Sequence, residues 1–428
     1  MDTRGGLARA MADLAEAFAS AGHRVTLLSD ECDEPAPSLP RVDIRRLRPA
    51  AAPSIAATSE QAPPETARHN LLHAAAVYRE VRRLHEREGR LDAVLAPLWR
   101  SEGAVCMLDP RFPTIVSCMT SLRTLTEIDP RYHHLPDLAE RLALERQALR
   151  RSRYLHGLTR AVLAKTVEDY NLRPLATAVI PRGLRDRRGR ANQQPAPTPP
   201  TSDRASILFV GRIERRKGVD VLFEAARRLI GAGVDAEITF AGASADPDLR
   251  SACDRQLEQD RGLADAVTFT GHVSEDELTR RLDAADVVCV PSRYESHGIV
   301  LLEAMMFGRA IVTSDAGGIL EVVTPDHDAL VVPAGDADAL TRALARATQD
   351  AQLRAALAAN ARRTYERRYE VGAVARHMVG FIEQIHQHRP RLSLHRGRKV
   401  RAELARLLVD TLRLDPSRAT RAAVELLA

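Results

Sequence analysis

Short apolar runs rich in branched residues alternate with longer helical segments along most of this 428-residue chain, and this alternation restricts the possible folds more than any other feature. In the first half, the runs predict strands at 24–29, 92–96, 114–118, 154–159 and 176–180. In the second half, they predict strands at 206–210, 236–241, 266–270, 286–290, 310–313 and 329–332. Segments with helical spacing, such as 218–230 and 275–284, lie between most of them. Strands that alternate with helices are typical of parallel sheets with both faces covered, so we expect an α/β fold.

One segment interrupts the alternation and predicts the domain boundary. It contains the charged stretch RDRRGR and then QQPAPTPP, neither of which can build a core. We therefore expect two Rossmann-like, doubly wound domains, at 1–182 and 205–370, joined by a Pro- and Arg-rich linker at 183–204. A closing helix at 371–388 and a basic helical tail at 389–428 would follow.

The first domain is expected to lack its first strand. A doubly wound domain begins with a strand that leads into a Gly-rich turn. This chain opens at the turn itself, Gly5-Gly6, followed by the amphipathic segment 7–21. Two explanations stay open: the start lies upstream, or the domain manages with one strand fewer.

Composition excludes several classes of protein. The net charge is +5, from 62 basic and 57 acidic residues, but aromatic residues are only 4% and the arginines are scattered, which disfavours nucleic-acid binding. No stretch approaches the roughly 18 uncharged apolar residues of a membrane span, and the N-terminus does not resemble a secretory signal. The five cysteines show no CxxC spacing, so we expect reduced thiols, no metal site and a cytoplasmic protein. The basic stretch 391–401 leaves peripheral contact with the inner face of a membrane open, although a solvated helix is favoured.

The strongest chemical signal is the segment PSRYESHGIVLLE, residues 291–303. Glu295 follows a buried strand, and ligands bind at the carboxyl ends of strands in open α/β sheets. A helix is expected to start at His297, Gly298 and Ile299, where free N–H groups can hold a phosphate. Glu303 lies within the first two turns of that helix. Two carboxylates beside an anion site suit the recognition of sugar hydroxyls, although for the pair alone a solvated loop and a helix surface are favoured.

A second motif strengthens the case for an anion site. In FVGRIERRKG, residues 209–218, a strand ends at Gly211, and Arg212 and Lys217 follow it. Both side chains can reach a diphosphate, the arginine as a bidentate fork and the lysine as a point charge. Lys217 is one of only three lysines in the chain, which makes its position informative. The glycines of DAGG, residues 315–318, could let the backbone approach a ligand closely.

Together these segments resemble the retaining glycosyltransferases of family 4, which have the GT-B fold of two Rossmann-like domains facing a cleft. The resemblance is most specific in FVGRIERRKG, in GHVSEDEL and in the block from Glu295 to Glu303 that continues into AMMFGRAIVTSDAGG. It implies a hexosyltransferase-like, metal-independent enzyme of glycan biosynthesis. The donor would be a nucleotide-diphosphate sugar such as a UDP- or GDP-sugar, acting as a substrate and not as a cofactor. The acceptor would be the hydroxyl of a sugar, a lipid or a small molecule.

The resemblance also implies a role for individual residues. Arg212 and Lys217, with the strand end at Gly211, would hold the donor diphosphate, and Glu303 would bind the ribose hydroxyls. Glu295 would lie at the transferred sugar and count with Arg212 and Lys217 among the catalytic residues. Backbone amides would complete the set of residues that bind the donor, and they are those of Gly6, His297, Gly298 and Ile299.

The chain departs from the family pattern at three places. His297 stands where the family has a Phe, and Arg182-Gly183 stands where it has Asn-Gly. Met119 occupies the position of a His that contacts the donor sugar in many relatives. Either Thr120 or Ser121 supplies a hydroxyl instead, or the sugar contact is weaker, so Met119, Thr120 and Ser121 are expected to be weak acceptor or sugar contacts. These departures keep two alternatives open. One is a GT-B sugar-nucleotide epimerase, and the other is a catalytically inactive scaffold that binds nucleotide sugars.

Overall fold

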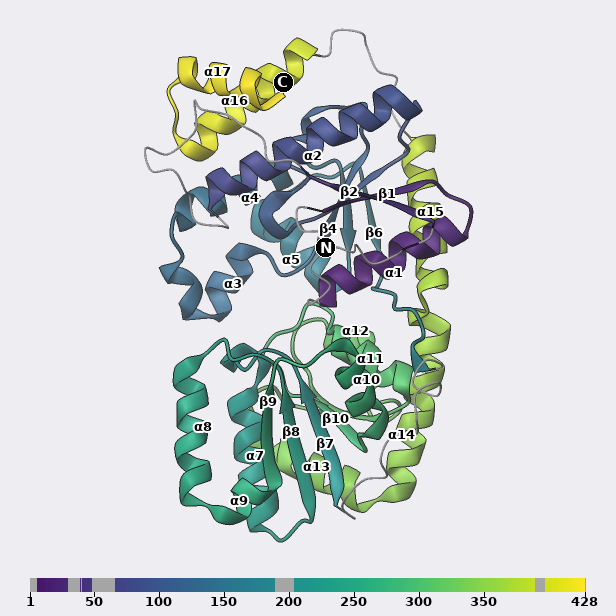
Figure 1. The fold of residues 1–428 in the computed structure, drawn as a ribbon, viewed down its shortest axis with the longest axis vertical. Coiled ribbons are helices and arrows are strands. Elements are labelled where there is room, and N and C mark those ends of the chain that lie inside the picture. Colours follow the sequence, from purple (N-terminus) through teal and green to yellow (C-terminus); the bar gives the residue numbers. More distant parts are fainter. Residues whose placement is uncertain are drawn as a thin grey trace. The chain divides into compact units, whose positions relative to one another are not determined.

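The computed structural model describes residues 6–29, 39, 41–47, 66–188, 204–388 and 397–427. Within these residues the chain forms two compact units (Figure 1). Unit 1 contains residues 18–180 and 375–427, and unit 2 contains residues 6–17 and 181–374. The described chain therefore starts in unit 2, forms most of unit 1, returns to unit 2 and ends in unit 1. This differs from the sequence-based division in two ways: residues 6–17 belong to unit 2, and the C-terminal tail belongs to unit 1.

Unit 2 is built on a six-stranded, wholly parallel sheet with the order β12-β11-β10-β7-β8-β9. Its strands are β7 (Ala205–Val210), β8 (Ala236–Ala241), β9 (Val267–Gly271), β10 (Val287–Val290), β11 (Ala310–Ser314) and β12 (Leu330–Val332). Each lies within two residues of a predicted strand. The order is that of a doubly wound fold, which confirms the predicted fold class for this half.

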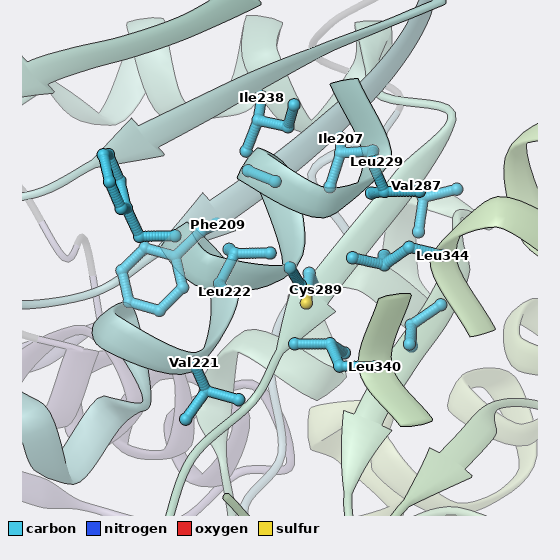
Figure 2. Packing of buried hydrophobic residues seen from close by; sticks show 14 of the residues in the cluster. Ile207, Phe209, Val221, Leu222, Leu229, Ile238, Val287, Cys289, Leu340 and Leu344 are labelled. Atoms are coloured by element: carbon cyan, nitrogen blue, oxygen red, sulfur yellow. The ribbon is translucent and has the colours of Figure 1, made fainter. Parts of the chain in front are cut away.

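Most helices of unit 2 lie between these strands along the chain, and the last two follow β12. They are α7 (Val219–Gly231), α8 (Pro247–Gln259), α9 (Arg261–Ala266), α10 (Glu275–Ala284), α11 (Ile299–Phe307), α12 (Ile319–Val322), α13 (Ala337–Gln349) and α14 (Ala351–Thr364). Figure 2 shows Ile207 and Phe209 of β7 beside Leu222 of α7, with Cys289 of β10 in the same core. The sheet is apolar on both faces because helices cover both.

The centre of this sheet lies between β7 and β10. From β7 the chain winds outward through β8 and β9, and it then returns to build β10, β11 and β12 on the other side. The carboxyl ends of β7 and β10 therefore mark the point at which the direction of winding reverses. In doubly wound proteins, ligands bind at this point.

In unit 1 the described strands form two parallel sheets. One pairs β1 (Val25–Ser29) with β2 (Val42–Arg46). The other has the order β3-β4-β5-β6. Its strands are β3 (Val94–Pro97), β4 (Thr114–Cys118), β5 (Tyr154–Gly157) and β6 (Ala176–Val179). In a doubly wound sheet, a strand before the first helix lies between these two groups. Among the described residues α1 (Gly6–Ser20) comes first.

Strand β2 was missed by the sequence analysis. Its sequence VDIRR carries three charged residues, so it lacks the apolar run that marks the other strands. It is tolerated because β2 lies at the edge of its sheet, where side chains reach solvent. The helices of this unit are α2 (Ala67–Glu88), α3 (Leu122–Ile128), α4 (Leu138–Arg151) and α5 (Arg160–Tyr170).

The C-terminal tail folds into two helices, α16 (Gly397–Leu412) and α17 (Pro416–Leu427). Leu404 and Leu408 of α16 and Leu426 of α17 are fully buried in the core that also contains Leu71 of α2. We expected a solvated helix here. The structure shows instead an apolar face that completes the core of unit 1, because leucines recur at helical spacing behind the basic residues.

The remaining helix, α15 (Val371–Gln387), carries the chain from unit 2 back into unit 1. Among the described residues, no helix combines the length and the apolar character that crossing a bilayer would need. The linker residues 189–203, the segments 48–65 and 389–396, and Gly5 lie outside the described residues.

Candidate functional site

Most candidate residues of the second half follow the carboxyl ends of the central strands of unit 2. Arg212 and Lys217 follow β7, and Glu295 follows β10, so they lie at the carboxyl ends of two neighbouring strands. A short 3-10 turn, Arg215–Lys217, presents the lysine just before α7.

Lys217 and Glu295 form an ion pair between Nζ and Oε1, and the carboxylate lies within the fold. Gly218 makes this approach possible. Its φ is +71°, and a Cβ at this position would lie 1.9 Å from the carbonyl oxygen of Pro291. Only glycine lets the turn after β7 pack so closely against the loop after β10.

Electrostatic surroundings favour the charged form of Glu295. Burial raises the pKa of its carboxyl, but the positive charges of Lys217 and Arg216 outweigh burial and bring the pKa below its ordinary value. Ser292 Oγ also donates to Glu295 Oε1 over 3.3 Å. A further cation, Arg182, lies close to this carboxylate. Burial lowers the pKa of Arg182 to about 10 while Glu295 acts to raise it, so the arginine keeps its charge near neutral pH.

Arg212 is tied to the same cluster through a second acid. Its Nη2 lies 3.1 Å from Oε1 of the buried Glu214, and Nη2 of Arg216 lies 2.6 Å from the same oxygen. Arg216 Nη1 in turn donates to the carbonyl of Tyr294 over 3.3 Å. About half of the Arg212 side chain stays exposed at 52%, so it remains available to an anion from solvent.

The glycines of the DAGG turn have a role other than the expected approach to a ligand. Gly317 has a φ of +60°, and a Cβ there would lie 2.2 Å from the carbonyl oxygen of Glu295. The amide of Gly318 donates to that same oxygen over 2.8 Å. The close contact is therefore with the backbone of Glu295, which the turn holds in place.

The start of α11 forms the expected cluster of backbone amides. Gly298 caps the helix in the left-handed region with a φ of +81°, and Ile299 is the first helical residue. Gly6, at the start of α1, lies against it: a Cβ on Gly6 would come within 3.0 Å of Cγ2 of Ile299. The structure thus brings the Gly6 turn to the α11 N-terminus, where N–H groups and the helix dipole attract anions.

His297 is buried and packs edge-on against Tyr369, with the ring centroids 6.0 Å apart and an interplanar angle of 90°. The imidazole therefore has a packing role in the core. The ring packs in the core, while the backbone at His297 remains just ahead of α11.

Glu303 is buried on α11 and pairs with Arg9 of α1, with 2.7 Å between Oε1 and Nη2. Burial raises the pKa of Glu303, and the charges of Arg9 and Arg187 oppose this without cancelling it. Arg187 is held by Asp13 of α1 over 2.9 Å. Helix α1 thus contributes two charged residues, Arg9 and Asp13, to the ion pairs of unit 2.

The three first-half candidates lie in unit 1, after β4. Met119 is buried, and Thr120 lines a pocket described below. The hydroxyl of Ser121 caps α3, accepting from the amide of Thr124 over 3.1 Å. Ser121 is therefore occupied by the fold, while Thr120 faces a space that a ligand can enter.

Sequence reasoning missed Arg9, Arg182 and Arg216. Arginine supplies nearly all the positive charge of the chain, so no single arginine stands out by type. Arg216 was within the motif FVGRIERRKG and could have been found by its position beside Lys217. Arg9 carries no such signal, because its role depends on α1 lying against α11.

Two family models match the chain. Residues 5–183 match the glycosyl transferase 4-like domain, and residues 191–364 match glycosyl transferases group 1. The two matches follow one another along the chain and together span most of it.

Curated relatives match mainly over part of their length. The chain is 34% identical to alpha-D-kanosaminyltransferase of Streptomyces kanamyceticus over 184 residues, 43% of this chain and 46% of that protein. It is 35% identical to phosphatidyl-myo-inositol mannosyltransferase of Mycolicibacterium smegmatis over 182 residues, 42% of this chain and 45% of that protein. The 2-deoxystreptamine N-acetyl-D-glucosaminyltransferase of Streptomyces fradiae is 32% identical over 244 residues, 55% of each chain. The chain thus spans about half the length of the curated relatives that it matches.

Solved structures share the fold over nearly the whole chain. Sucrose-phosphate synthase from Thermosynechococcus elongatus has a TM-score of 0.69 at 23% identity, covering 90% of this chain and 94% of that one. WaaG, a glycosyltransferase involved in lipopolysaccharide biosynthesis, has a TM-score of 0.64 at 19% identity, covering 88% and 96%. Each half of the chain is thus similar to a glycosyltransferase family, and the chain has the GT-B fold of two Rossmann-like domains.

Proposed function

We propose that this protein transfers a sugar from a nucleotide-diphosphate donor to an acceptor hydroxyl, with retention of configuration and without a metal ion. The observation that carries the proposal is the Lys217–Glu295 ion pair at the switch point of unit 2. A lysine and a charged carboxylate side by side suit a donor that joins a diphosphate to a hydroxyl-rich sugar.

The cationic side of this site would bind the diphosphate. Arg212 and Lys217 flank the loop after β7, and the α11 amides add uncharged donors from a second direction. As the anomeric C–O bond breaks, negative charge grows on the departing diphosphate. Donors already fixed by the fold stabilise that charge without reorganising, which is the largest source of catalysis in many enzymes.

The carboxylates would bind the two ends of the donor. Glu303 would accept hydrogen bonds from the ribose hydroxyls, competing with Arg9 for its oxygens. Glu295, kept charged by Lys217 and Arg216, would accept from hydroxyls of the transferred sugar and stabilise positive charge on its ring. In a retaining transfer the acceptor oxygen bonds to the anomeric carbon on the face that the diphosphate leaves. The hydroxyl proton passes to the departing phosphate.

One similar structure supports the choice of donor. The structure most informative in this respect is Anabaena HepE, solved in complex with UDP and glucose, with a TM-score of 0.65 at 19% identity over 90% of this chain and 97% of that one. Its sequence is too distant to carry the nucleotide over to this chain, so UDP, GDP and ADP donors all enter the test.

The test is a two-step assay on the full chain. A thermal-shift screen of UDP-, GDP- and ADP-sugars identifies the donor, because a ligand that binds only the native state raises its melting temperature. Isothermal titration then compares Glu303→Ala with Glu258→Ala, an exposed acid on α8. We expect weaker nucleotide binding only for Glu303→Ala. Equal binding by both variants, with a stability loss in the first, would place Glu303 outside the donor site.

Product analysis separates transfer from the alternatives. A transferase releases free nucleotide faster when an acceptor is added, and it slowly hydrolyses the donor without one. An epimerase converts the donor sugar with no added acceptor and no sustained nucleotide release. Binding without any turnover would support the inactive scaffold.

A further inference from the structure

Unit 1 has a pocket of its own, of about 440 Å³ including the solvent at its mouth. Six of its lining residues matter here: Asn70, Trp99, Arg100, Thr120, Arg141 and Glu145. They come from α2, α4 and the loops that follow β3 and β4. The pocket therefore lies at the carboxyl ends of parallel strands, the edge at which α/β sheets bind ligands.

Two buried polar atoms around this pocket lack a hydrogen-bond partner among the described residues. One is Oδ1 of Asn70, whose side chain is 96% buried because only 4% of the residue is exposed. The other is Nε of Arg141. Most buried polar groups in proteins are paired, so an unpaired amide oxygen and an unpaired guanidinium N–H in one pocket indicate a ligand that pairs with both.

The charges around the pocket favour an anion. Arg100 and Arg141 contribute two positive charges, and Glu145 is the acid that also lines the pocket. Glu145 is already used by the fold: Oε2 accepts from the amide of Leu122 over 2.8 Å, and Oε1 accepts from Tyr170. Burial also raises the pKa of Glu145, although these hydrogen bonds oppose the rise. Its negative charge is therefore poorly available to a ligand.

Trp99 gives the pocket a flat apolar wall. It is 38% exposed, the only tryptophan of the chain, and it stands in the short turn after β3. The next residues, Arg100 and Ser101, both adopt positive φ values, +56° and +54°. Backbone strain of this kind is found at ligand-binding segments, where the fold fixes a side chain in place.

We propose that this pocket binds the acceptor, and that the acceptor is a polyol or sugar carrying an anionic group such as phosphate. The anion would accept from Arg141 and Arg100, a hydroxyl would donate to Oδ1 of Asn70, and the ring would pack on Trp99. Thr120 would add a hydroxyl contact. The assignment as acceptor site rests on the proposed function, whereas binding to the pocket does not.

The single tryptophan reports on the pocket directly. Glucose 6-phosphate is titrated into the full chain while Trp99 fluorescence is recorded, with glucose and inorganic phosphate titrated separately. We expect saturable binding of glucose 6-phosphate and much weaker binding of each fragment. Equal binding of glucose and glucose 6-phosphate would overturn the anionic preference. Saturation by phosphate alone at the same concentration would overturn the polyol requirement.

The first variant and its control lie on one helix, α4. Arg141→Gln is expected to weaken glucose 6-phosphate binding by about tenfold or more, as the loss of a charge-assisted hydrogen bond would. Arg146→Gln, an exposed arginine on the same α4, is expected to leave it unchanged. A smaller and equal effect of both would show a nonspecific electrostatic contribution and overturn the site. Asn70→Leu keeps the side-chain size while removing the amide. It should weaken the binding of glucose 6-phosphate without changing the binding of inorganic phosphate.

Two further measurements separate the possible sources of the ligand and the two proposals. Vesicles containing phosphatidylinositol, compared with phosphatidylcholine vesicles, present the same anionic polyol as a lipid headgroup. Binding to the former only, together with weak binding of glucose 6-phosphate, would assign a lipid-borne acceptor, whereas binding of neither would overturn the proposal. Donor binding to Lys217 and Glu303 is measured in parallel. If nucleotide sugars bind and the pocket stays empty, this inference fails while the proposed function stands.

Discussion

Arg9 and Glu303 form a buried ion pair that links the first helix of the chain to α11, with 2.7 Å between Nη2 and Oε1. Nη1 of Arg9 also lies 3.6 Å from Glu275. Burial raises the pKa of Glu303, and the positive charge of Arg9 limits that rise. Glu303 therefore depends on a residue almost 300 positions earlier in the sequence.

Replacing Arg9 with Gln should make nucleotide binding depend on pH. Arg9 is the strongest charge opposing the raised pKa of Glu303, so its loss raises that pKa further. A protonated acid accepts fewer hydrogen bonds from ribose, and affinity should then improve as pH rises from 6 to 9. Isothermal titration of the preferred nucleotide measures this, with Arg9→Lys as the charge-preserving control. Identical pH profiles for wild type and Arg9→Gln would show that Glu303 does not need this partner.

Lys217→Ala should weaken donor binding or turnover by about 2 kcal/mol or more, the scale of a lost charged hydrogen bond in a shielded site. The substitution also leaves the carboxylate of Glu295 without its closest cation. Lys165→Ala is a matched control, because Lys165 pairs with Glu127 at the surface of unit 1. Steady-state kinetics with the identified donor provides the measurement. Unchanged kinetics for Lys217→Ala would remove this lysine from the site.

Glu295 should contribute to stability in a defined pH range. Its folded pKa lies below its ordinary value near 4.5, so its contribution is present above that value. It is lost as pH falls through the folded pKa, because folding must then give up the ion pair with Lys217. Urea unfolding between pH 3 and 6 should show a shallower acid limb for Glu295→Gln than for wild type. Parallel curves would mean that the carboxyl titrates alike in the folded and unfolded chain.

Gly218→Ala should destabilise unit 2 by about 2 kcal/mol or more, because overpacking against backbone adds to an unfavourable φ. The new Cβ would lie 1.9 Å from the carbonyl oxygen of Pro291. Gly231→Ala, at the end of α7, has open space around it and should stabilise slightly. Thermal unfolding followed by circular dichroism compares the two. A melting temperature for Gly218→Ala at or above that of Gly231→Ala would contradict the close packing of these loops.

Leu404→Ala should cost about 2–5 kcal/mol, as expected for a fully buried leucine. Lys399→Ala, exposed on the same helix, should cost little. Chemical denaturation of both variants tests whether α16 is part of the folded core. Equal stability of the two variants would indicate that α16 is a solvated helix, as its basic residues suggested.

The sequence allowed the prediction of both doubly wound halves, because buried parallel strands leave an apolar run in the sequence. Strand β2 escaped, since an edge strand can carry charges such as Asp43 and Arg45. The tail was misjudged for a related reason: its basic residues were counted before the leucines at positions such as 404 and 408. A sequence pattern predicts burial well where the buried residues all belong to one helix or strand.

The candidate site was predictable only where its residues are close in sequence. Lys217 and Glu295 each sit in a motif at the end of a strand, and parallel topology brings those ends together. Arg9 could not be found, because nothing in α1 shows which face meets α11. The role of Gly317 also needed three dimensions, since only the structure shows that it packs on Glu295.

The return of the chain into unit 1 has a consequence for synthesis. Helices α16 and α17 leave the ribosome after all of unit 2, yet they cover the apolar side of α2, which emerges early. Until then, the part of α2 that packs on α16 and α17 stays uncovered for the time needed to translate over 300 codons. Most of unit 1 is therefore synthesised before most of unit 2, but the core of unit 1 is completed only after unit 2 has been synthesised.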